Sequence, residues 1–264
     1  MRLDARAPRP VPSPDRSLRS RLAGRAWSRA GAVAAVLATG PTRRALSLST
    51  RSALLVVGSI TIAVSASVTL WTGLGAGPLD LFIGSIARRS GLPLSLAVWA
   101  TVGTLMAAAW ALGRRPGPGT VLSPLLVGPV LQASLASLAS LDLPSSLVVR
   151  VAIHLVAIGG IGLGAGALVV SGLGAGTGEL FASATSDRIG RPVLHVRPVI
   201  EATWVVLGVA LGGPAGLGTV LVAVLVGPAV AHGHRCVDAI AARSIARVSA
   251  THGTIIAREL ARTG

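Results

Sequence analysis

A stretch of 28 residues without a single charge, Val151 to Gly178, constrains the fold more than any other feature of this chain. A helix that crosses a bilayer needs about 20 predominantly apolar residues, whereas a water-exposed surface needs charged and polar side chains. The whole chain agrees with this segment, because 52% of its 264 residues are hydrophobic, only 12% are charged, and the mean hydropathy is +0.73. Lipid is therefore the expected solvent.

Six stretches have the length and hydropathy of membrane-spanning helices. The fifth is the least regular, because Pro198 and Glu201 lie inside it. The apolar segment 79–87 is too short to cross a bilayer and is interpreted as re-entrant or interfacial. The sequence thus predicts an all-α integral membrane protein of about six transmembrane helices, at residues 52–72, 94–112, 120–141, 147–171, 197–212 and 218–234.

The formal net charge of +15 is concentrated at the N-terminus, where residues 1–51 hold eleven Arg against two Asp. Basic residues beside apolar spans mark the cytoplasmic side, so we interpret this charge as a topology signal and expect no nucleic-acid partner. Residues 1–50 are predicted to be a disordered cytoplasmic tail, with a cleaved signal as the alternative. Residues 236–264 are predicted to be a helical cytoplasmic tail, and the loop 142–146 then lies outside.

The absence of Lys and the abundance of Arg, Ala, Gly and Val are typical of a GC-rich bacterial genome. Together with the predicted spans, this composition places the chain in a bacterial plasma membrane as a multi-pass protein. Both termini are expected in the cytoplasm.

An internal repeat of 99 residues runs through the apolar part of the chain. Residues 51–129 align with residues 150–228 without a gap, and 28 of 79 positions are identical. Phe82 and Phe181, the only two Phe, occupy equivalent positions. Because each copy has an odd number of spans, the second copy must enter the membrane from the other side. The sequence therefore predicts two inverted three-helix repeats, one within residues 51–141 and one within residues 147–235.

Each repeat carries the sequence GLGAG, followed by an acidic residue. Such dense glycine interrupts a helix, and irregular backbone at membrane depth is tolerated only where it is buried in protein or lines a cavity. A short helix is expected after each turn, with Asp80 or Glu179 in its first turn. These acids either cap the helix or bind a solute or proton. The turn glycines are Gly73, Gly75, Gly77, Gly172, Gly174 and Gly176.

Polar residues inside other predicted spans are further candidates. Glu201 lies four residues after Arg197 and is interpreted as an ion-pair partner or as a functional carboxylate. His154, in an apolar helix, is either a hydrogen-bonded packing residue or a proton relay. Thr120 and Thr219 open the third span of each copy, where a Thr side chain can cap the helix or bond across to a neighbour.

No cofactor, metal or catalytic site is expected. The single Cys236 excludes an internal disulfide, and no further ligand accompanies His232 and His234. The glycine run at 160–166 follows no strand, so it indicates close helix packing rather than dinucleotide binding. No nucleophile and base lie at a workable spacing, so an enzyme is not expected.

Three segments together, GLGAGPLDLF, ARRSGLP and GPGTVLSPLLVGP, resemble the bacterial YczE/YyaS/YitT type of membrane protein, mainly its YczE branch. The resemblance covers approximately residues 51–235. The chain departs from the family pattern at Leu79, where the family often has an aromatic residue, and at Gly178 in the second copy. The resemblance implies a multi-pass plasma-membrane protein without an established biochemical activity.

These features favour a secondary carrier or channel-like permease for a small solute or ion, with the two half-helices that follow the GLGAG turns meeting near the midplane. The alternative is a non-transporting scaffold or accessory protein that supports assembly or export of another component. The lipid bilayer is the expected partner in either case. The sequence names no substrate, and self-association is left open.

Overall fold

The structure is a computed structural model that describes residues 46–263, with side chains described through Ser244. These residues form eight α-helices and no strand. The tail predicted at residues 1–50 lies outside the described residues except for 46–50, where α3 already begins. The helices are α3 (Leu48–Trp71), α4 (Pro78–Ser90), α5 (Leu94–Ala111), α6 (Pro118–Leu138), α7 (Leu147–Ser171), α8 (Thr177–Ile189), α9 (Val193–Ala210) and α10 (Leu217–Thr263).

Six of these helices, α3, α5, α6, α7, α9 and α10 as far as Ser244, are long and apolar enough to cross a membrane. The prediction of an all-helical chain with six apolar spans is therefore confirmed. The fifth span begins at Val193 rather than at 197, because Pro198 removes only one backbone hydrogen bond and the helix continues through it. The sixth does not end near 234 but continues as one helix to Thr263.

The surface of these helices is apolar. Val148 and Val156 on α7 are 78% and 77% exposed, and Val199 and Val206 on α9 are each 66% exposed. A water-soluble protein does not display such a continuous series of large apolar side chains. Lipid tails would cover them, as the composition predicts.

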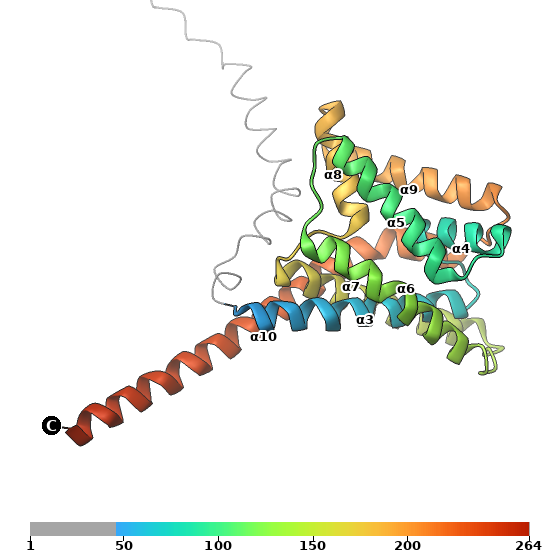
Figure 1. Cartoon of the computed structure of the whole chain (residues 1–264). Coiled ribbons are helices and arrows are strands. Elements are labelled where there is room, and N and C mark those ends of the chain that lie inside the picture. The colour runs from blue at the N-terminus through green and yellow to red at the C-terminus, as the bar shows by residue number, and fades with distance from the viewer. Residues whose placement is uncertain (1–45, 264) are drawn as a thin grey trace, which may run out of the picture.

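The helices form two groups in space (Figure 1). Helices α3, α6, α7 and α10 pack together on one side, and α4, α5, α8 and α9 lie on the other. Helices α3 and α7 run in opposite directions. Gly58 of α3 faces Gly164 of α7, whereas Ser65, two turns later in α3, faces Gly160, which comes earlier in α7. Helix α10 runs on past the other helices at its C-terminal end.

Helix α7 is central because its glycines admit neighbours on two sides. A Cβ on Gly164 would lie 2.6 Å from the Gly58 carbonyl oxygen of α3. A Cβ on Gly162 would lie 2.5 Å from the Ala229 carbonyl carbon of α10. Both distances are far below van der Waals contact, so the glycine run at 160–166 serves close helix packing, as its sequence indicates.

The short helices α4 and α8 each pack on a span from the other half of the chain. Leu81 of α4 lies against Gly208 of α9. Leu180 and Ala184 of α8 form a buried cluster with Ala109 of α5. The two halves are therefore joined through their short helices as well as through α3 and α7.

One aromatic side chain of α9, Trp204, contacts both of the chain's Phe residues. Its ring centroid lies 5.1 Å from that of Phe82 on α4 and 6.4 Å from that of Phe181 on α8. Trp204 thus links the two short helices to one span.

Helix starts recur at the interval of the sequence repeat. The starts of α3 and α7 (48 and 147), α4 and α8 (78 and 177), α5 and α9 (94 and 193), and α6 and α10 (118 and 217) each differ by 99 residues. The local structure of the first half is thus repeated, element by element, in the second.

Candidate functional site

The two Gly-rich turns pack against the starts of the last spans. Gly75 has a φ of +109°, and a Cβ there would lie 2.5 Å from Thr219 Oγ1 and 2.9 Å from the Gly216 amide nitrogen. A Cβ on Gly174 would lie equally close, 2.5 Å, to Thr120 Oγ1. Each turn therefore needs glycine to let the opposite half approach.

Reciprocal backbone hydrogen bonds fix this approach. The Gly119 amide donates to the Leu173 carbonyl at 2.8 Å, and the Gly218 amide donates to the Leu74 carbonyl at 2.7 Å. Donors and acceptors differ by 99 residues in both cases. The turn of each half thus satisfies an unpaired amide at a helix start of the other half.

The two Thr residues act differently despite their equivalent positions. Thr120 Oγ1 donates to the Ala175 carbonyl at 2.7 Å and so bonds across to the second Gly-rich turn. Thr219 Oγ1 accepts from the Gly216 amide at 3.3 Å, which is a local contact at the start of α10. Of the two roles considered from sequence, Thr120 takes the bond to a neighbour and Thr219 takes the cap.

Two arginines that sequence reasoning did not select hold the ends of α3 and α7. Arg51, at the start of α3, donates to the Ser171 carbonyl at 2.7 Å and the Gly172 carbonyl at 3.1 Å at the end of α7. Arg150, at the start of α7, donates twice to the Thr72 carbonyl, at 2.8 and 2.6 Å. A cation is favourable at a helix C-terminus, where carbonyls lack partners. The sequence signal that could have identified these two residues is that Arg occupies equivalent positions, 51 and 150, in both copies of the repeat.

His154 is fully buried between three segments. Its Nδ1 lies 2.9 Å from Thr72 Oγ1, and its Nε2 lies 3.3 Å from the Gly218 carbonyl oxygen. At the equivalent position in the first half, Leu55 packs on Gly119. His154 is therefore a hydrogen-bonded packing residue at the join of the halves, and a proton-relay role stays a prediction.

Asp80 lies in the first turn of α4, after Gly77 at the N-cap and Pro78 at the first helical position. Its carboxylate makes no hydrogen bond or ion pair with any residue in the described part of the chain, so no capping contact holds it there. It lines a cavity of about 80 Å³ together with Gly73, Gly75 and Arg88. An acid without a partner beside a cavity has the features of a ligand site.

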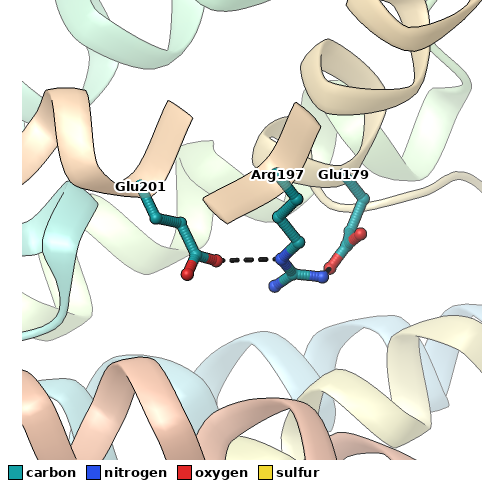
Figure 2. A network of polar contacts seen from close by, with 3 residues as sticks. All are labelled: Glu179, Arg197 and Glu201. Atoms are coloured by element: carbon teal, nitrogen blue, oxygen red, sulfur yellow. Dashed lines mark hydrogen bonds and ion pairs between the residues drawn. The ribbon is translucent and has the colours of Figure 1, made fainter. Parts of the chain in front are cut away.

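Glu179, the equivalent acid of α8, is held by a cation instead (Figure 2). Arg197 of α9 binds Glu179 through Nη1 at 2.5 Å and binds Glu201 through Nε at 2.8 Å. The ion pair expected between Arg197 and Glu201 is thus present and extends to a second helix. In the first half, Val98 and Val102 stand where Arg197 and Glu201 stand in the second.

The candidate residues therefore fall into three places. Glu179 and Glu201 meet at Arg197, His154 lies at the join of α3, α7 and α10, and Asp80 lies at its own cavity. Among residues 46–244, whose side chains the structure describes, no three His, Cys, Asp or Glu side chains lie together in a way that could hold a metal ion.

The fold and these sites define a multi-pass α-helical protein whose two Gly-rich turns are bonded into opposite halves. Residues 49–235 match the model of a family described as "Family of unknown function (DUF6198)", and the chain belongs to this family. It is also 29% identical over 174 residues to "Uncharacterized membrane protein YczE" of Bacillus subtilis (strain 168), which covers 64% of this chain and 79% of that protein.

No solved structure matches the chain significantly. The family membership that the motifs suggested is confirmed, and the six apolar helices are those of a membrane protein.

Proposed function

We propose that this protein is a permease for a small solute, built from two halves that lie in the bacterial plasma membrane in opposite orientations. Three observations support the inversion: helix starts recur after 99 residues, α3 and α7 run antiparallel, and the bonds between the halves are reciprocal. Inverted halves with interrupted helices at their interface are a recurrent architecture of secondary transporters.

The proposed topology places both termini in the cytoplasm and the loop 142–146 outside. Three spans in each half, with the short α4 and α8 not crossing, return the chain to the side where it began. Reporter fusions at Ser145 and after Gly264 should give opposite compartment signals. Equal signals at the two positions would rule out the inversion.

The observation that best supports a transport function is that the Asp80 carboxylate lines a cavity and has no partner among the described residues. A carboxylate inside a membrane protein is costly and is normally paired or used. Asp80 faces a cavity and has no partner among the described residues, whereas Glu179 is paired with Arg197. The asymmetry supports Asp80 as the residue that binds solute or a coupling ion, and it supports a structural role for Glu179 and Glu201.

A solute uptake screen in a strain lacking the gene tests this function. Wild-type protein should restore uptake of at least one small solute, and Asp80→Asn should abolish it at equal membrane abundance. Asp142→Asn is the matched control, because Asp142 is an exposed acid in a loop and should leave uptake unchanged. Full uptake by Asp80→Asn would exclude Asp80 from the transport site.

An accessory role is the second candidate, and α10 favours it. This helix has 47 residues, about 70 Å at 1.5 Å per residue, and its last part runs past the other helices (Figure 1). A projecting helix of this length suits the binding of another protein. Truncation after Ser244 separates the two candidates. Loss of the phenotype on truncation, combined with full activity of Asp80→Asn, would favour the accessory role.

A further inference from the structure

Two opposite charges line the cavity beside α4 and do not pair with each other. Asp80 lies in the first turn of the helix, and Arg88 lies two turns later in its last turn. Both line the cavity of about 80 Å³, but no ion pair joins them in the described structure. The cavity therefore offers a carboxylate that can bind a cationic group and, at a separate place, a guanidinium that can bind an anionic group.

Arg88 extends back along α4 toward Asp80. Its Nη2 donates to Ser85 Oγ at 3.4 Å, and its Nη1 lies 3.8 Å from where a Cβ on Gly84 would be. The guanidinium therefore lies level with Gly84, whereas the Asp80 carboxylate leans back to Gly77, with its Oδ2 3.1 Å from where a Cβ on Gly77 would be. Seven residues, or about 10 Å along the axis, separate these two levels. Because Gly84 has no side chain, the space between the two charges stays open.

The size and walls of the cavity limit what fits between these charges. A volume of about 80 Å³ is several times the roughly 10–15 Å³ that a single water molecule needs. Leu70, Leu81 and Pro214 supply apolar wall, which suits a short carbon backbone between two charged ends. A ligand of few heavy atoms with one charge at each end matches this lining.

The second half of the chain does not repeat this arrangement. Ser183 stands where Gly84 stands in the first half, and Asp187 stands in place of Arg88. Asp187 is bound to Arg114 at 2.6 Å, and Glu179 is bound to Arg197. The pair of separate, opposite charges is therefore specific to α4.

From this geometry, and resting on the permease function proposed above, we infer that the solute is a small zwitterion of amino-acid size. Asp80 binds its ammonium group, and Arg88 binds its carboxylate through charge-assisted hydrogen bonds. A simple cation would use Asp80 alone, and a simple anion would use Arg88 alone. The zwitterion uses both charges and bridges the space over Gly84.

Thermal unfolding of the purified full-length protein tests the assignment. The probes are glycine, alanine and β-alanine, with methylammonium and acetate as singly charged controls at the same concentrations. At least one zwitterion should raise the melting temperature by roughly 3 °C at tenfold excess over its Kd. Asp80→Asn and Arg88→Gln should each remove this shift. Arg89→Gln is the matched control, because Arg89 is exposed like Arg88 but does not line the cavity.

The outcomes separate this inference from the transport function. Equal stabilisation by methylammonium that survives Arg88→Gln would overturn the zwitterion and leave the permease standing. No shift with any of the three zwitterions would also overturn it. Stabilisation by a zwitterion that reconstituted vesicles do not take up would support the binding site and contradict transport.

Discussion

The short helices α4 and α8 start alike and are surrounded differently. Each follows a GLGAG turn, has glycine at the N-cap and carries an acid in its first turn. Around α8, Arg197 joins Glu179 to Glu201, whereas Asp80 on α4 faces a cavity without a partner among the described residues. The repeat thus preserved the backbone of the site and changed its charges.

This difference is what we expect if the two halves have different roles, one structural and one in binding the solute. The turns and their reciprocal bonds to the other half occur in both copies, so they belong to the architecture. The ion pairs at Arg197 link α8 to α9 and use charges that the first half lacks. If one half holds the assembly and the other binds a solute, substitutions in equivalent positions should have unequal consequences.

The largest effect on stability is expected at the shared turn. Gly75→Ala places a Cβ 2.5 Å from Thr219 Oγ1 on a backbone with φ of +109°. The strain of that backbone and the overpacking together should cost about 3 kcal/mol of unfolding free energy. Thermal unfolding in detergent measures it, with Gly103→Ala as control because nothing lies near a Cβ there. Equal melting temperatures for both variants would mean that the turn is not held as described.

A smaller effect is expected at the arginines that bind the helix ends. Arg150→Gln removes two charge-assisted hydrogen bonds to the Thr72 carbonyl and should cost about 2 kcal/mol. Arg51→Gln should have a similar cost, since Arg51 makes two such bonds at the end of α7. The comparison of their melting temperatures checks the proposed equivalence. A loss confined to one of them would argue against reciprocal contacts.

The ion pairs of α8 should contribute less. Arg197 is 38% exposed and Glu179 is 46% exposed, so the pair resembles an exposed ion pair rather than a fully buried one. We expect Arg197→Gln to cost below about 1 kcal/mol, and Glu179→Gln in that background to restore part of it by removing an unpaired carboxylate. A double-mutant cycle on thermal unfolding gives the coupling energy. Strict additivity would show that the two side chains do not interact.

The elements visible to sequence reasoning were those set by local composition. Long apolar runs with few charges predicted the six long helices, and the pattern Gly77-Pro78 with Asp80 predicted the start of α4. The repeat marked which positions correspond. Residues 236–264 were predicted to be helical but as a tail separate from the sixth span, because their charged residues end the apolar run, whereas α10 continues from that span to Thr263 as one helix.

The surroundings of the candidate residues depend on long-range packing that no local pattern encodes. The Arg197 and Glu201 pair was foreseeable from a spacing of four residues, but the bond to Glu179 joins two helices. The absence of a partner for Asp80 depends on which helices enclose it. For His154, only the packing of α3 and α10 on α7 supplies Thr72 and the Gly218 carbonyl as partners.

A side-by-side comparison of Asp80→Asn and Glu179→Gln tests the central claim most directly. Both replace a carboxyl group with an amide of the same shape. Asp80→Asn should change the unfolding free energy by less than about 0.5 kcal/mol and abolish the uptake phenotype that the wild-type gene restores. Glu179→Gln should lower the melting temperature measurably and retain uptake. The reverse pattern, with Asp80→Asn active and Glu179→Gln stable but inactive, would contradict the account.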